Sequence, residues 1–209
     1  MTRYGRIEPI GSSHVTASFD CGSEDQSTWL RQHALQAHRS DTAKVYVICR
    51  HGTNDVVGYY ALSAGSVASE DAPERLKQGI GRYPVPVVVL ARLGVDVSEQ
   101  GMGLGSALVK DCFLQVASVA DRVGIRALLI HAETAKAAEF YFRIDPAFEP
   151  SPSDPLHVVL LLKDLRRAIR DAAAESQTDA ARSSADSRPV QSVVSPPPVD
   201  QRGRGGTGA

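Results

Sequence analysis

The segment that most constrains the fold is an apolar run at residues 85–97, followed at once by Gln100-Gly-Met-Gly-Leu-Gly105. The run is typical of a buried strand, and the residues after it carry apolar side chains at helical spacing. Strand, glycine turn and helix N-terminus therefore follow one another. A helix start leaves backbone N–H groups unpaired and carries the positive end of the helix dipole, so this arrangement suits an anionic group such as a pyrophosphate. The glycines let the backbone approach phosphate oxygens because they carry no Cβ.

The spacing of these glycines excludes two common nucleotide-binding motifs. The dinucleotide motif G-x-G-x-x-G fails because its last position is Ser106 when counted from Gly101, and Leu108 when counted from Gly103. The P-loop motif requires a lysine directly after its last glycine, whereas the first lysine after the turn is Lys110. What remains is Q-x-x-G-x-G at the end of a long apolar strand.

The C-terminal part of the chain differs in composition from the rest. After Ile169 there is no Leu, Ile, Met or aromatic residue, and Ser, Ala, Pro, Gly and Arg dominate to the end. Such a segment buries too little apolar surface to offset its chain entropy. We therefore expect one folded domain at residues 1–169, a usual size for a single core, and a disordered tail at residues 170–209.

Charge, cysteine content and hydropathy narrow the class of protein. Residues 1–170 carry 19 basic and 19 acidic side chains, so no basic excess indicates nucleic-acid binding, although a local patch remains open. The scattered Cys21, Cys49 and Cys112 include no C-x-x-C pair, which predicts buried thiols in a reducing compartment and no metal site. No apolar stretch approaches the ~18 residues of a membrane span, so we expect a cytoplasmic protein without membrane contact.

Periodicity predicts the order of the elements and the fold class. It indicates a helix at 27–38, a hairpin of strands at 44–50 and 55–63, a short helix or mobile loop at 70–81, the central strand at 85–97, a helix at 103–120, a strand at 126–131, a helix at 134–142 and a strand at 156–162. The hairpin implies antiparallel pairing in the first half, and the alternation of strands and helices implies parallel pairing in the second. The expected fold class is α/β (α+β), with a mixed central sheet and helices on both faces.

The glycine motif resembles the acetyl-coenzyme A (acetyl-CoA) binding motif of the GNAT superfamily of N-acetyltransferases, whose fold has the same order of elements. The likeness extends over residues 15–167. Several stretches are similar to one subgroup, the GNAT-type toxins of bacterial toxin–antitoxin modules. These stretches are Phe19-Asp-Cys-Gly22 before Trp29-Leu-Arg31, Val57-Gly-Tyr-Tyr-Ala-Leu62, residues 84–96, Gly103-Leu-Gly105 and Ala138-Glu-Phe-Tyr141.

The resemblance implies an activity and partners. Members of the subgroup use acetyl-CoA to acetylate the α-amino group of the amino acid on charged tRNA, which blocks translation. A small antitoxin, commonly of ribbon-helix-helix type, neutralises them, and the resemblance also implies a homodimer. Two alternatives stay open at this point. One is a GNAT enzyme for a small amine, an antibiotic or a protein N-terminus, and the other is a catalytically silent binding module.

The resemblance also assigns site residues by position. Leu93 and Val95 would pair their backbones with the pantetheine arm of the cosubstrate, as an added peptide does. The pyrophosphate would be held by Gln100, Gly101, Gly103, Gly105 and Ser106. Tyr141 would face the acetyl thioester, and its phenol, with a pKa near 10, is a suitable donor to the departing thiolate. The alternative for Tyr141 is a half-buried core tyrosine.

One departure from the family concerns the loop after this tyrosine. The family usually has Gly-Phe three or four residues after the tyrosine, whereas here six residues without a glycine separate Tyr141 from Phe148. We expect Phe148 to take the place of the usual phenylalanine and the loop to be reshaped. The change should affect the choice of acceptor more than the binding of the cosubstrate.

The central strand supplies no general base, because its only carboxylate, Asp96, lies at the end that leads into the glycine turn. Free α-amino groups titrate near pH ~8, against ~10.4 for a lysine side chain, and the amine of an aminoacyl ester titrates lower still. Such an amine needs no strong base, so the missing carboxylate favours aminoacyl-tRNA over a protein lysine. Glu133, Glu139 or a histidine from elsewhere in the chain stays open as a base.

Binding of tRNA requires contacts to phosphates. Arg92 is the first candidate, because a charged residue inside an apolar strand is costly unless it points into a wet, functional groove. The other basic candidates are Arg31, Arg39, Lys44 and Arg82, with Arg50, Arg75 and Lys77 beside them. The alternative for each is an ordinary solvated side chain. We interpret His131 and Trp29 as core residues.

Overall fold

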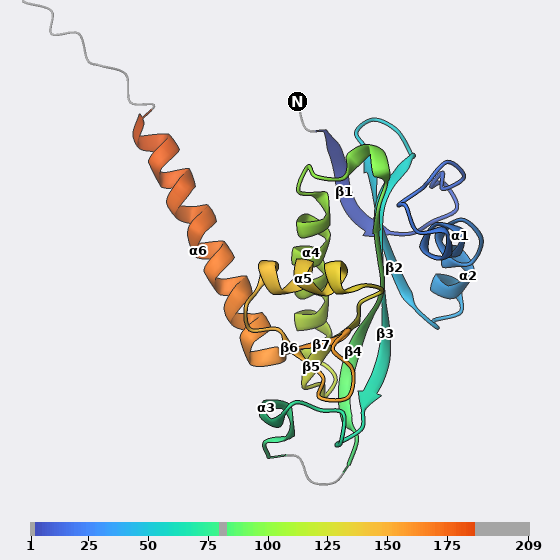
Figure 1. The fold of residues 1–209 in the computed structure, drawn as a ribbon. Helices are drawn as coiled ribbons and strands as arrows, with labels where there is room; N and C mark the ends of the chain where they lie inside the picture. Colours follow the sequence, from blue (N-terminus) through green and yellow to red (C-terminus); the bar gives the residue numbers. More distant parts are fainter. Residues whose placement is uncertain (1–2, 80–82, 187–209) are drawn as a thin grey trace, which may run out of the picture. The chain divides into compact units, whose positions relative to one another are not determined.

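The computed structural model describes residues 3–79 and 83–186 (Figure 1). The chain divides into two units, Met1–Ala172 and Ala173–Ala209. The sheet, its covering helices α1 to α5 and the site described below all belong to the first unit. Arg82, one of the predicted RNA contacts, lies outside the described residues.

Within the described residues the strands form one seven-stranded sheet in the order β1-β2-β3-β4-β5-β7-β6. The strands are β1 (Tyr4–Pro9), β2 (Lys44–Arg50), β3 (Val56–Val67), β4 (Val85–Val95), β5 (Ala127–His131), β6 (Glu149–Pro150) and β7 (His157–Leu161). β4 and β5 run parallel, and the other neighbouring pairs run antiparallel. The mixed sheet with an antiparallel first half is therefore confirmed.

The last strand departs from the expected parallel pairing. β7 pairs antiparallel with both β5 and β6. The reason is that β6, at the outer edge, runs in the direction of β5, and the chain then folds back so that β7 fills the place between them. The sequence did not reveal β6, which has two residues, or β1, which has a largely exposed, weakly apolar pattern.

Helices cover both faces of the sheet, as expected (Figure 1). On one face lie α4 (Leu104–Ala120) and α5 (Ala135–Ile144), and on the other lie α1 (Glu24–Gln32) and α2 (Ala34–Arg39). The single helix predicted at residues 27–38 is thus two helices, which meet at His33. The segment at residues 70–81, for which a helix and a loop were both open, contains the short helix α3 (Glu74–Lys77).

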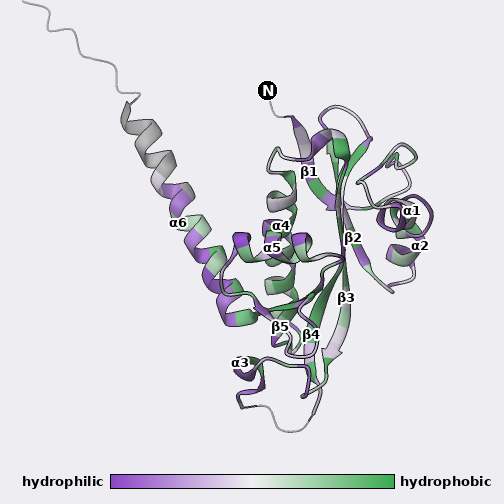
Figure 2. Ribbon diagram, in the orientation of Figure 1, coloured by the Kyte–Doolittle hydropathy of each residue, from purple (hydrophilic) through white to green (hydrophobic). Residues whose placement is uncertain are grey.

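The core is divided by the sheet, because successive side chains of a strand point to opposite faces. Adjacent residues of β3 show this: Tyr59 packs on the face of α1 and α2, Tyr60 packs on the face of α4 and α5, and both are fully buried. Figure 2 shows hydrophobic residues along the central strands and on the sides of the helices that face them. Burial of a large apolar side chain stabilises the fold by ~1.5–3 kcal/mol, so these two layers hold β4 rigidly in the centre.

Helix α6 (Leu162–Asp186) corrects the expectation for the start of the tail. The sequence predicts disorder from residue 170, but the helix continues through residues 170–186. Alanine is the strongest helix former, and this segment holds Ala172-Ala-Ala174 and Ala180-Ala181 without a proline or glycine, which explains the helix. The rest of the predicted tail, residues 187–209, lies outside the described residues. None of the described helices is both long and apolar enough to cross a membrane.

Candidate active site

The site begins where β4 and β5 part. Their parallel pairing joins residues 87–90 to residues 127–130 and ends at Leu90 and Ile130. At the same point the register of β4 against β3 shifts, because Ala61 pairs with Arg92 while Leu62 pairs with Leu90, which leaves Ala91 as a bulge. A bulge bends its strand and increases the local twist. The edge of β4 at residues 93–95 therefore faces an opening instead of a strand.

A tight turn follows this open edge. The short helix η1 (Val97–Glu99) leads into Gly101 and Gly103, whose φ angles are +76° and +81°. These left-handed conformations strain residues with a side chain but suit glycine. Gly103 is the N-cap of α4, and no side chain caps the helix. The N–H groups of the first turn of this 17-residue helix thus meet the opening without a side-chain acceptor.

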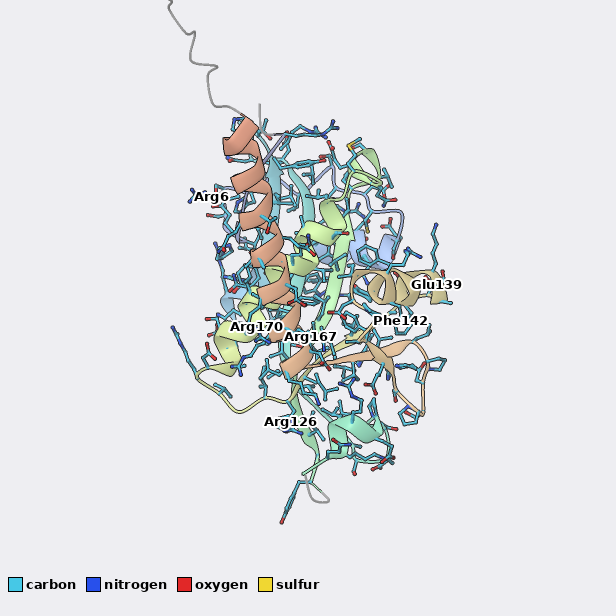
Figure 3. The ribbon with its side chains drawn as sticks, turned by 90° about the vertical axis from the view of Figure 1, so that its left-hand side faces the viewer. Arg6, Arg126, Glu139, Phe142, Arg167 and Arg170 are labelled. Atoms are coloured by element: carbon cyan, nitrogen blue, oxygen red, sulfur yellow. The ribbon has the colours of Figure 1, made fainter. Side chains whose placement is uncertain are left out.

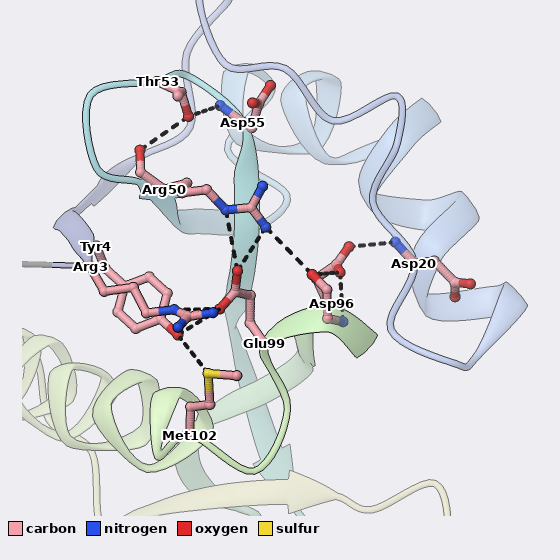
Figure 4. Close-up of polar contacts among 10 residues, drawn as sticks. Arg3, Tyr4, Asp20, Arg50, Thr53, Asp55, Asp96, Glu99 and Met102 are labelled. Atoms are coloured by element: carbon pink, nitrogen blue, oxygen red, sulfur yellow. Dashed lines mark hydrogen bonds and ion pairs between the residues drawn. The ribbon is translucent and has the colours of Figure 1, made fainter.

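Glu99 anchors the turn to two distant strands (Figure 4). Its carboxylate accepts hydrogen bonds from Arg3 Nε at 2.9 Å, Tyr4 Oη at 2.9 Å and Arg50 Nη2 at 2.7 Å, and its side chain is only 2% exposed. The hydrogen bond from Arg50, followed by that from Tyr4, holds the pKa of this carboxyl below its ordinary value. A buried carboxylate without such partners would be costly, so the two arginines stabilise the turn in this position.

The loop before α1 is tied to the same turn. Asp20 accepts with its carbonyl from Val97 N at 2.8 Å. Its N–H donates to the carboxylate of Asp96 at 3.1 Å (Figure 4). The side chain of Gln100 donates from Nε2 to the carbonyls of Cys21 and Val95, both at 3.0 Å. Gln100 therefore orders the end of β4 through its own side chain.

One cavity of about 700 Å³ connects these features. All eight residues that the sequence assigns to the cosubstrate and to catalysis line it: Leu93, Val95, Gln100, Gly101, Gly103, Gly105, Ser106 and Tyr141. The open edge of β4 and the N-terminus of α4 thus lie in the same wall, and Tyr141 is brought in from α5. An extended, phosphate-bearing molecule fits this combination.

Tyr141 lies on α5, which begins after Thr134 as predicted; the Thr134 side chain accepts from Ala137 N. The tyrosine is 6% exposed, and its ring packs against Phe140 and Phe148, with centroids 5.2 Å and 5.9 Å away. Burial, followed by the nearby Cys112, raises the pKa of the phenol. It stays protonated at neutral pH and can donate a proton. Tyr141 is therefore buried in the core and also lines the cavity, and its catalytic role stays a prediction.

The sequence and fold can now be compared with known proteins. The model of the acetyltransferase (GNAT) family matches residues 13–144. The chain belongs to the GNAT family. A relative from Mycobacterium tuberculosis (strain ATCC 25618 / H37Rv), named tRNA-acetylating toxin, is 43% identical over 171 residues, which are 82% of this chain and 100% of the relative.

Two solved structures are similar to this GNAT chain in fold. AtaT complexed with acetyl-methionyl-tRNAfMet has a TM-score of 0.70 and 30% identity, over 77% of this chain and 96% of that chain. A tyrosine-to-phenylalanine mutant of the AtaT toxin, bound to the C-terminus of the antitoxin AtaR and acetyl-CoA, has a TM-score of 0.64 and 28% identity, over 77% and 94% of the two chains. The expected GNAT fold is confirmed.

The cavity of the GNAT domain also contains residues that the sequence did not assign to it. They come from the loop before α1, from the first turn of α1, from η1 and from α5: Cys21, Ser23, Gln26, Glu99, Lys136, Phe140 and Arg143. Glu133, left open as a base, lines the cavity too and accepts from Ser23 Oγ at 2.9 Å. Lys136 and Arg143 share one side of α5 at a spacing of seven residues, a helical repeat that could have indicated them.

Some of the basic residues expected to contact RNA form ion pairs or hydrogen bonds within the chain, and others are exposed. Arg92 donates to Asp25 at 2.6 Å and lies over the ring of Trp29, 5.1 Å from its centroid. Arg31 binds Glu24 and the carbonyl of Phe19, and Lys44 pairs with Asp41. Arg39 is exposed. Arg126, Arg167 and Arg170 lie on another side of the domain (Figure 3).

Trp29 and His131, which we interpret from the sequence as core residues, are not fully buried. Trp29 is only partly buried and stacks on Tyr59, with ring centroids 6.0 Å apart, while its other contact is Arg92. His131, at the end of β5, is exposed. The strand pattern around His131 is apolar, which favoured a core position, but β5 ends at this residue where the sheet opens.

Proposed function

We propose that this chain transfers the acetyl group of acetyl-CoA to the α-amino group of aminoacyl-tRNA and thereby blocks translation. The observation that carries the proposal is the cavity that joins the open edge of β4, the uncapped N-terminus of α4 and the phenol of Tyr141. When bound, acetyl-CoA supplies an activated thioester. Membership of the GNAT family and similarity to a tRNA-acetylating toxin support the reaction.

The residues present fit the cosubstrate. The backbone of β4 at Leu93 offers hydrogen-bonding groups on the side where β5 has left, which suits the amide groups of a pantetheine arm. Gly101, Gly103, Gly105 and Ser106 would let the first N–H groups of α4 donate to a pyrophosphate. Lys136 and Arg143 add positive charge to the same cavity.

Tyr141 acts as the general acid in this proposal. The amine nitrogen forms a bond to the carbonyl carbon as the bond from carbon to sulfur breaks, and the phenol donates its proton to the thiolate that leaves. The raised pKa of the buried phenol keeps it protonated at neutral pH, so a proton is available to the thiolate. Of the two carboxylates in the cavity, Glu99 is held by Arg3 and Arg50, and Glu133 by Ser23.

The choice of acceptor is tested by direct competition. The purified chain and [14C]acetyl-CoA are incubated with charged tRNA, uncharged tRNA, polyamines or peptides, and the labelled product is identified. We expect label on the amino acid of charged tRNA and none on uncharged tRNA. Turnover with small amines or peptides alone would overturn the proposal and favour the alternative GNAT activity. Failure to bind acetyl-CoA in a calorimetric titration would favour a silent binding module.

We further propose the partners and location that the toxin subgroup implies. AtaT binds the C-terminus of an antitoxin, so we expect an antitoxin of ribbon-helix-helix type to neutralise this chain. We also expect a homodimer and a cytoplasmic location, where charged tRNA is found. Light scattering after size exclusion, with and without the product of a neighbouring small reading frame, checks the dimer and the complex.

A further inference from the structure

The vertex between β4 and β5 is where the acyl transfer must take place in the proposed function. The pyrophosphate site lies beyond Val95, so an arm that follows β4 inward ends where the strands rejoin, at Leu90 and Ile130. The next residue of β5 is His131, which therefore stands at the vertex. Tyr141 approaches the same place from α5.

His131 and Tyr141 flank the vertex from opposite faces of the sheet. Ile130 packs in the same cluster as Tyr141, on the face of α4 and α5. The next side chain along a strand points the other way, and His131 accordingly lines a separate hollow with Leu129 and Val159 on the opposite face. In the proposed function the thioester would lie between the two side chains, with Tyr141 on the side of the cosubstrate cavity and His131 on the side of the separate hollow.

His131 forms a pair with His157. The two residues are register partners on β5 and β7, and their rings stack with centroids 4.1 Å apart. Asp154 Oδ2 lies 3.5 Å from Nε2 of His157, so a carboxylate lies beside the pair. The hollow of about 150 Å³ also contains Asp71, Ser151 and both imidazoles, with room for a few water molecules at ~30 Å³ each.

We propose that His131, oriented by His157 and Asp154, accepts the proton that leaves the acceptor amine during acetyl transfer. The amine loses this proton as its nitrogen bonds to the carbonyl carbon, while Tyr141 gives a proton to the thiolate. Water in the hollow then carries the proton from His131 to solvent, and the phenolate of Tyr141 regains one, so the charges balance over one turnover. The inference rests on the proposed function.

The charges around His131 favour its neutral form. His131 is exposed at the end of β5, but partial desolvation of its ring, followed by the neighbouring His157, lowers its pKa from the ordinary 6.5, and Asp154 opposes this less strongly. Of the strands on either side, β4 presents Val85, Val87 and Val89 to this face and β7 presents Val159 and Leu161, and the carboxyl that lines the hollow is that of Asp71. A neutral imidazole at cytoplasmic pH can accept a proton.

The experiment compares His131→Gln and His157→Gln with His51→Gln, a control in the exposed turn between β2 and β3. In wild type, both the amine and His131 must be neutral, so log kcat/KM for charged tRNA should fall at low pH with a slope approaching two. His131→Gln should lower kcat about 100-fold and reduce that slope to one, with acetyl-CoA affinity unchanged in calorimetry. His157→Gln should move the His131 titration to higher pH.

A second readout does not depend on turnover. Imidazole resonances of the free protein, followed by NMR against pH, should show His131 titrating below 6.5 in wild type and higher in His157→Gln. Wild-type rate and slope in His131→Gln, with a fold unchanged by circular dichroism, would overturn the inference. So would a His131 that is protonated at pH 7. Absence of tRNA acetylation by the wild-type chain would instead overturn the proposed function.

Discussion

A single oxygen atom distinguishes the two roles that Tyr141 can have. Tyr141→Phe keeps the ring and its packing against Phe140 and Phe148, and removes only the proton donor. We expect kcat to fall at least ~100-fold, the lower range of general acid catalysis, while acetyl-CoA affinity stays unchanged. Rapid-quench kinetics and calorimetry measure the two quantities. Tyr83→Phe, at a side chain 79% exposed, is the control. Unchanged kcat in Tyr141→Phe would leave the tyrosine a core residue only.

Glu99 links the charge of one carboxyl to the stability of the turn. Its pKa is lowered in the folded chain, chiefly by Arg50, so its ionised form stabilises the fold above the unfolded-state pKa. That contribution is lost as pH falls from about 4.5 through the lowered value. We predict that Glu99→Gln lowers Tm at pH 7 and that the difference from wild type shrinks as pH falls below ~4.5.

Thermal unfolding at pH 3 to 7 measures this difference. The control is Glu24→Gln, whose carboxylate pairs with Arg31 but is 84% exposed, and such surface pairs contribute little. Because Glu99 fixes the turn beside Gln100, its substitution should also raise KM for acetyl-CoA. Parallel pH curves for Glu99→Gln and wild type would show that the carboxylate is uncharged or unpaired in solution.

At the scale of elements, the junction of η1 and α4 depends on a left-handed residue. Gly103 has φ +81°, and a Cβ there would meet no atom within 4 Å, so the cost of Gly103→Ala is conformational. We expect a loss of ~1–2 kcal/mol in unfolding free energy and up to about tenfold weaker acetyl-CoA binding. Chemical denaturation and calorimetry test this. Gly124→Ala, in open space without positive φ, should change neither.

Arg92 of β4 contacts α1, and its substitution tests whether it also binds RNA. Arg92 already pairs with Asp25 and stacks on Trp29, so it either holds α1 on the sheet or also reaches a phosphate. If it reaches one, Arg92→Gln should raise KM for charged tRNA and reduce the salt slope of binding by about one. Filter binding at several salt concentrations measures the slope. An effect equal to that of Arg170→Gln, on α6, would argue against a specific contact.

The elements show what a sequence can and cannot predict. β2, β4, β5 and α4 were predicted within two residues, because apolar periodicity and a glycine turn are local signals. The direction of β7 was not, since it depends on the two-residue β6. The cluster around Glu99 was also missed. Its partners are Arg3, Tyr4 and Arg50, and the first two precede Glu99 by 96 and 95 positions, a separation that no local sequence pattern spans.

For the whole molecule, the cavity and the two core layers lie within the unit Met1–Ala172. Leu165 of α6 is fully buried in the core and Ile169 packs against it, and among the side chains that the structure describes beyond Ala172 none belongs to either layer. The part of α6 that the core needs therefore ends near Ile169.

We predict that a chain ending at Ala172 keeps the full-length Tm and acetyl-CoA affinity, because it retains Leu165 and the complete cavity. A chain ending at Leu161 loses Leu165 and should unfold at least ~2 kcal/mol more easily, as expected for removal of a buried leucine. Calorimetric scans and acetyl-CoA titrations of both truncations measure this. Equal stability of the two would place the end of the domain before α6. If the chain ending at Ala172 loses acetyl-CoA binding, residues 173–209 take part in the site themselves.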